Sequence, residues 1–61
     1  MTEKQVTDTV DQIKYIALEM GEGFGRDIAK GIIEFNSKKI AEREKDHFYT
    51  EVMFHIAPYL A

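Results

Sequence analysis

The chain has 61 residues, no cysteine and a formal net charge of −3, which limits it to one small domain. A domain of this size buries only about 60% of the surface that its unfolded chain exposes. Chains of this length therefore usually need a disulfide, a metal or a second subunit for stability. The lack of cysteine excludes disulfides and thiolate metal sites. We therefore expect self-association, as a homodimer or a larger homo-oligomer.

The charge is unevenly distributed along the chain, but no segment is strongly basic. Residues 23–45 hold six basic and four acidic side chains, and acidic residues outnumber basic ones on both sides of this segment. Nucleic-acid binding normally shows as a clustered basic excess, so nucleic acid is not an expected partner. The first residues are too polar for a signal peptide, and no apolar run approaches the roughly 18 residues of a membrane span. We expect a soluble, cytoplasmic protein that does not bind a membrane.

Apolar residues at steps of three and four predict a first helix over residues 3–20. Its expected buried stripe is Val6, Val10, Ile13, Ala17 and Met20. Two large apolar residues, Tyr15 and Leu18, lie off this stripe. They indicate a surface for a partner.

Three glycines in five residues, Gly21, Gly23 and Gly25, predict the end of the first helix. Glycine adopts the left-handed conformation that closes a helix at no steric cost, so we interpret Gly21 as the stop. The alternative is an uninterrupted helix, in which Ala17, Gly21, Gly25 and Ala29 would form a stripe of small residues. The cost of roughly 1 kcal/mol for each glycine inside a helix favours the turn.

A second helix is predicted over residues 26–44. We expect Ile28, Ile32 and Phe35 at the centre of its buried face, with Ala29, Ile33 and Ile40 on one flank. Residues 42–47 contain no apolar side chain, so they form either an exposed stretch of helix or a second turn. A third helix is predicted over residues 47–58, with Asp46 as its N-cap and its end or a kink at Pro58.

The last fourteen residues, 48–61, are apolar on almost every side of a helix. Such a helix is normally buried on more than one side, and a chain this short has little else to cover it. We therefore expect another copy or another protein to pack on it, and Phe54→Asp to split that assembly. The full predicted interface is Tyr15, Leu18, Phe48, Tyr49, Val52, Met53, Phe54, Ile56, Tyr59 and Leu60.

Two weaker patterns bear on ligands. The glycine turn is followed by the start of a helix and by two basic residues. Backbone N–H groups at a helix start attract anions, so this pattern predicts an anion site at Gly23, Gly25, Arg26 and Lys30. A simple turn is favoured over that site, because no strand precedes it and Asp27 adds a negative charge. Glu44 and His47 have a di-iron ligand spacing, with Glu51 and His55 following at steps of four, but a solvated charge run is the favoured interpretation.

These observations predict an all-α fold in a single domain, residues 1–61. A two- or three-helix protomer would complete a helical bundle by homo-oligomerisation. No catalytic set, metal site or cofactor site is expected. We expect a non-enzymatic regulator or inhibitor that binds a larger protein through an apolar helix face, a class that includes small inhibitors encoded by phages and mobile elements. The alternative is a protein that sequesters a small anion or nucleotide in a pocket between subunits.

Overall fold

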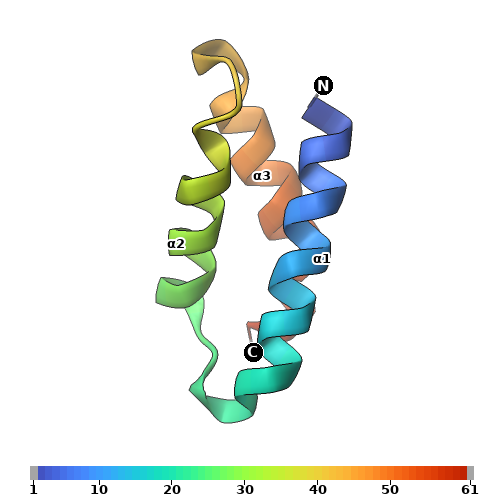
Figure 1. Ribbon diagram of the computed structural model, residues 1–61, viewed down its shortest axis with the longest axis vertical. Helices are drawn as coiled ribbons and strands as arrows, with labels where there is room; N and C mark the ends of the chain where they lie inside the picture. The colour runs from blue at the N-terminus through green and yellow to red at the C-terminus, as the bar shows by residue number, and fades with distance from the viewer. Residues whose placement is uncertain (1, 61) are drawn as a thin grey trace.

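The computed structural model describes residues 2–60, which form a three-helix bundle (Figure 1). The helices are α1 (Thr2–Met20), α2 (Arg26–Ser37) and α3 (Lys45–Ile56). Short 3-10 helices follow them at Gly21–Gly23, Glu42–Glu44 and Ala57–Tyr59. The bundle measures 33 × 17 × 17 Å. The predicted all-α class is confirmed, and none of the helices within residues 2–60 is long and apolar enough to span a bilayer.

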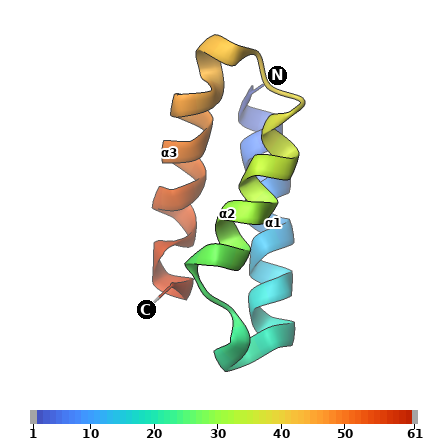
Figure 2. The same cartoon turned by 90° about the vertical axis from the view of Figure 1, so that its left-hand side faces the viewer.

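The chain runs down α1, up α2 and down α3, so α2 is antiparallel to both neighbours (Figures 1 and 2). In the view of Figure 1, α1 and α2 lie side by side and α3 lies behind them. The surface of the bundle therefore has three seams, one between each pair of helices. Two of these seams differ sharply in chemistry.

The core is a single apolar cluster between the three helices. Its buried members are Val10, Ile13, Ala29, Ile33, Ile40, Phe48, Val52 and Ile56. Each helix contributes residues at steps of three or four, because that spacing keeps side chains on one face. In α1 the predicted stripe is confirmed at Val10 and Ile13, whereas Met20 at its end is 42% exposed.

The buried row of α2 differs from the predicted one. Ala29, Ile33 and Asn36 face the core, whereas Ile28 is 38% exposed and Phe35 is 64% exposed. The buried row is offset by one residue from the predicted row, which is a rotation of about 100° around the helix. The sequence does not indicate this buried row, because the row contains Asn36, and asparagine is normally expected at the surface or at a helix cap.

The connections follow local backbone chemistry. Gly21 has a φ of +59°, and the backbone N–H of Phe24 donates to the Gly21 carbonyl at 3.1 Å. The predicted glycine turn is therefore confirmed, and the uninterrupted helix is wrong. The second helix ends at Ser37, where the hydroxyl donates to the Glu34 carbonyl at 2.8 Å, and does not continue to residue 44.

The start and end of the third helix are also close to the predicted ones. It begins at Lys45, so Asp46 lies in its first turn and is not its N-cap. It ends at Ile56, and Pro58 lies in the 3-10 helix that follows. The predicted stop at the proline is confirmed.

One premise of the predicted interface is wrong. Phe48, Val52 and Ile56 are fully buried within this single chain. They pack against the core residues of α1 and α2, so the main apolar face of α3 needs no second copy to cover it.

Candidate interaction surfaces

Large apolar side chains remain exposed on all three helices. Those at least one-third exposed are Tyr15, Leu18, Met20, Ile28, Phe35, Tyr49, Phe54 and Tyr59. Of the ten predicted interface residues, Tyr15, Leu18, Tyr49, Phe54 and Tyr59 are in this set, Met53 and Leu60 are half-buried, and the three core residues are not available to a partner. The C-terminal helix therefore carries fewer accessible apolar residues than its composition indicates.

A hydrogen bond fixes how α1 and α2 face each other. The Nδ2 atom of Asn36 donates to Oε1 of Gln12 at 3.1 Å and to the Ile32 carbonyl at 2.8 Å. Gln12 therefore lies on the side of α1 that meets α2, and Asn36 on the side of α2 that meets α1. On α1, the residues three and four positions after Gln12 share its side. On α2, Ile32 lies one turn before Asn36, and Ile28 and Phe35 lie at steps of four and three from Ile32.

This register defines an apolar surface along the seam, which we name the α1–α2 face. From α1 it contains Gln12, Tyr15, Ile16 and Glu19, and from α2 it contains Ile28, Ile32, Phe35 and, just beyond the helix, Lys38. Tyr15 and Phe35 are its most exposed apolar members, at 66% and 64%. The Lys38 ammonium lies 5.7 Å from the centre of the Phe35 ring, a cation–π distance.

Ile28 and Phe35 are interface candidates that the sequence does not indicate, because their spacing predicts the buried row of α2. The only signal that could have found them was a competing row of the same period, Ala29, Ile33, Asn36 and Ile40. Choosing between the two rows required knowing that the buried amide would find a partner on another helix.

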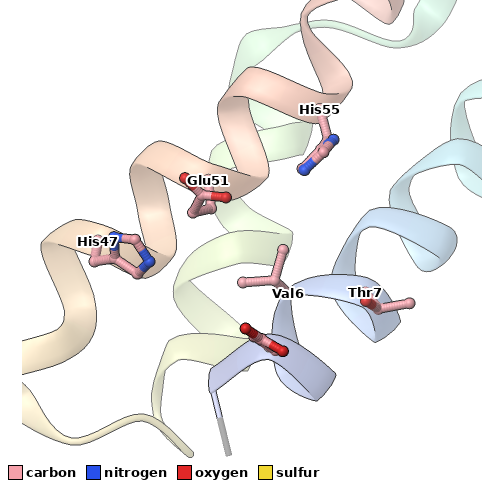
Figure 3. Close-up of a pocket in the computed structure, with 6 residues that line it drawn as sticks. Val6, Thr7, His47, Glu51 and His55 are labelled. Carbon is pink, nitrogen blue, oxygen red and sulfur yellow. The ribbon is translucent and has the colours of Figure 1, made fainter.

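The seam between α1 and α3 is polar. A groove of about 330 Å³ is lined there by Glu3, Val6, Thr7, His47, Glu51 and His55. Figure 3 shows His47, Glu51 and His55 along one side of α3, with Val6 and Thr7 opposite them on α1. Val6, Thr7 and His55 also line a smaller adjoining pocket that extends along α1 to Lys14.

The groove contains side chains of the types that bind metal ions, but these side chains do not converge on one position. His47, Glu51 and His55 follow each other at steps of four, which separates their backbone positions by about 6 Å per step. No group of three or more His, Asp or Glu side chains within the described part of the chain could hold a metal ion. Glu44, which the sequence paired with His47, is not among the residues that line the groove.

The structure brings together three of the four predicted anion-site residues. Gly23, Gly25 and Arg26 line a shallow pocket at the start of α2, together with Asp27, Ile28 and Leu60. Lys30 is exposed one turn further along α2 and is not part of the lining. The carboxylate of Asp27 and the apolar side chain of Leu60 both oppose an anion at this place. The anion site stays a prediction.

Comparisons of this chain with protein-family models, with curated proteins and with solved structures find no significant match. The functional conclusion therefore depends on the surface of the molecule itself.

Proposed function

We propose that this chain is a non-enzymatic protein-binding regulator, which acts by covering part of a larger protein with exposed apolar helix surface. The observation that carries the proposal is the exposure of large apolar side chains on the outer sides of the helices. Leu18 is 77% exposed and Phe54 is 75% exposed. Scattered exposed apolar residues are ordinary, whereas contiguous apolar patches mark interaction sites, and we take Leu18 and Phe54 to belong to such a patch.

The positions of Leu18 and Phe54 support a partner outside the bundle. Both side chains point away from the core, and the residues one turn before Phe54 on α3, Thr50 and Glu51, are polar. Neither is needed to fill the core, so their exposure leaves them for another molecule. Their contribution to binding would come from removing apolar area from water, at about 25 cal/mol per Å².

Self-association is the second part of the proposal. The core is filled by one chain, so a second copy would add stability by covering exposed apolar surface and not by completing the core. A monomer of this size is marginally stable, and dimerisation would raise its stability as protein concentration rises.

Affinity capture tests the partner-binding function. The wild-type chain, a Leu18→Ser/Phe54→Ser variant and a Lys30→Ala/Glu34→Ala control are immobilised and exposed to lysate of the native host. We expect at least one protein to be enriched by the wild type and by the control, and lost with the Leu18→Ser/Phe54→Ser variant. If the wild type enriches nothing beyond an immobilised unrelated helical protein, the proposed function is wrong.

A further inference from the structure

We propose that the α1–α2 face is the contact between two copies of this chain, related by a two-fold axis that reverses the second copy end to end. The inference rests on the self-association included in the proposed function. It adds the surface and the orientation. The occupant is a second copy because of the apolar centre of the face, its size and the charges at its two ends.

The centre of the face is aromatic and apolar. Gln12 on α1 lies level with Asn36 on α2, and the two helices are antiparallel, so Tyr15 and Phe35 lie at nearly the same level of the face, between its Lys38 end and its Glu19 end. Binding energy in protein interfaces concentrates in aromatic residues near the centre. The half-buried Ile16 and Ile32 continue the apolar surface between the two rings.

One side of the bundle is large enough for the contact of a stable dimer. The bundle is 33 Å long and 17 Å wide, so a footprint along its length has a flat area of roughly 560 Å², and the accessible area of a rough surface is larger. A typical stable interface buries about 800 Å² on each partner. One side of the bundle is therefore large enough, provided that the contact extends beyond the apolar centre to both ends.

The two ends of the face carry opposite charges. Lys38 and Lys39 follow α2 at one end. At the other end, Glu19 lies in the last turn of α1 and Glu22 in the 3-10 helix that follows it. All four are exposed, and none of them forms an ion pair with another residue of the described chain.

Some of the other charges near each end pair with each other or have a neighbour of opposite sign. At the lysine end, Lys4 pairs with Asp8 at 3.0 Å. At the glutamate end, Arg26 and Asp27 are neighbours of opposite sign.

A reversed second copy satisfies both ends at once. Its lysine end lies over the glutamate end of the first copy, and the two-fold axis creates the same pairing a second time. A partner with a surface of one sign would be repelled at one end. Complementary charges of this kind fix orientation more than they add affinity.

The first experiment is sedimentation equilibrium at micromolar concentration on the wild type, Phe35→Asp and Phe54→Asp. We expect a wild-type dimer and a monomeric Phe35→Asp variant, because the change places an unpaired charge in a dry contact. Phe54→Asp should remain dimeric, which replaces the split expected from the sequence, because the main apolar face of α3 is covered within one chain. Both phenylalanines are exposed in the protomer, so the helix content by circular dichroism should be the same in all three proteins.

The second experiment tests the orientation by charge reversal. Lys38→Glu or Glu19→Lys alone should weaken the dimer roughly tenfold in Kd, because each change alters two symmetric contacts. The double variant should return to within about twofold of the wild type. Glu34→Lys, outside the face on α2, is the matched control and should leave the Kd unchanged.

Each result has one meaning. A monomeric wild type overturns this inference and the self-association, while capture of a partner through Leu18 and Phe54 would leave the regulator function standing. A dimer split by Phe54→Asp and not by Phe35→Asp places the contact on α3 and overturns the face. A dimer split by Phe35→Asp in which the double reversal fails to recover overturns the reversed orientation.

Discussion

The two seams of α1 cover the same core with opposite chemistry. Toward α2, the flank of the helix carries Tyr15 and Ile16 and meets the isoleucines of α2. Toward α3, it carries Glu3 and Thr7 and meets a histidine and glutamate row. The buried stripe of α1 therefore determines how the helix packs in the bundle. Its two flanks determine which side chains each seam presents to other molecules.

The seams also differ in how the helices are joined. A side-chain hydrogen bond from Asn36 to Gln12 crosses the α1–α2 seam. The six described residues that line the α1–α3 groove form no side-chain hydrogen bond or ion pair across it. The hydrogen bond from Asn36 fixes the register of α1 against α2, and the groove residues provide no such link between α1 and α3.

The largest effect is expected in the core that both seams share. Phe48→Ala should lower the free energy of unfolding by about 3–5 kcal/mol, because it opens a cavity at a fully buried position. In a chain of this size that loss removes most or all of the folded population at room temperature. Phe54→Ala, the same change at a 75% exposed site on the same helix, should alter the free energy by less than about 0.5 kcal/mol. Urea titration followed by circular dichroism measures both, and equal losses would contradict the assignment of the α3 core face.

The turn that brings α1 and α2 together provides the next effect. Gly21→Ala should lower the free energy of unfolding by about 1–2 kcal/mol, because alanine resists a φ of +59° although the space around the position is open. Gly31→Ala in α2 is the matched control with equally open space, and it should raise the free energy by about 0.5–1 kcal/mol. Thermal unfolding of the two variants should therefore shift in opposite directions. A shift in the same direction would exclude a left-handed Gly21.

A buried hydroxyl in α1 provides a stabilising prediction. Thr9 is fully buried and its Oγ1 atom has no hydrogen-bond partner. Thr9→Val keeps the shape and removes the unsatisfied group, so the free energy of unfolding should rise by about 1 kcal/mol. Thr7→Val, at an exposed position on the groove side, should leave stability nearly unchanged. Destabilisation by Thr9→Val in chemical denaturation would mean that the hydroxyl has a partner.

The smallest expected effect is a difference in side-chain coupling energy between the two seams. A double-mutant cycle on Gln12 and Asn36 should give a coupling energy near the low end of the 0.5–1.5 kcal/mol range, since Gln12 is exposed to water. The same cycle on Thr7 and Glu51, which line the α1 side and the α3 side of the groove, should give a coupling near zero. A larger coupling across the groove would reverse the comparison between the seams.

Much of the fold could be predicted from local physics. The period of the apolar residues predicts three helices, the left-handed preference of glycine predicts the stop at Gly21, and the geometry of proline predicts the end of the last helix near Pro58. Exposure of Tyr15 and Leu18 was also predicted, because both residues lie off the apolar stripe of their own helix. Each of these features depends only on residues within a few positions in the chain.

Which faces are buried was decided by the tertiary structure. In α2 two apolar rows compete, and the row with Asn36 is buried because Gln12, 24 residues earlier, accepts the hydrogen bond of its amide. In α3 the apolar residues divide into a covered face and an exposed Phe54 only once α1 and α2 pack against one side. A pattern along one helix records which side chains share a face. The free energy of burial depends on the partner that covers that face, and only the packed bundle specifies the partner.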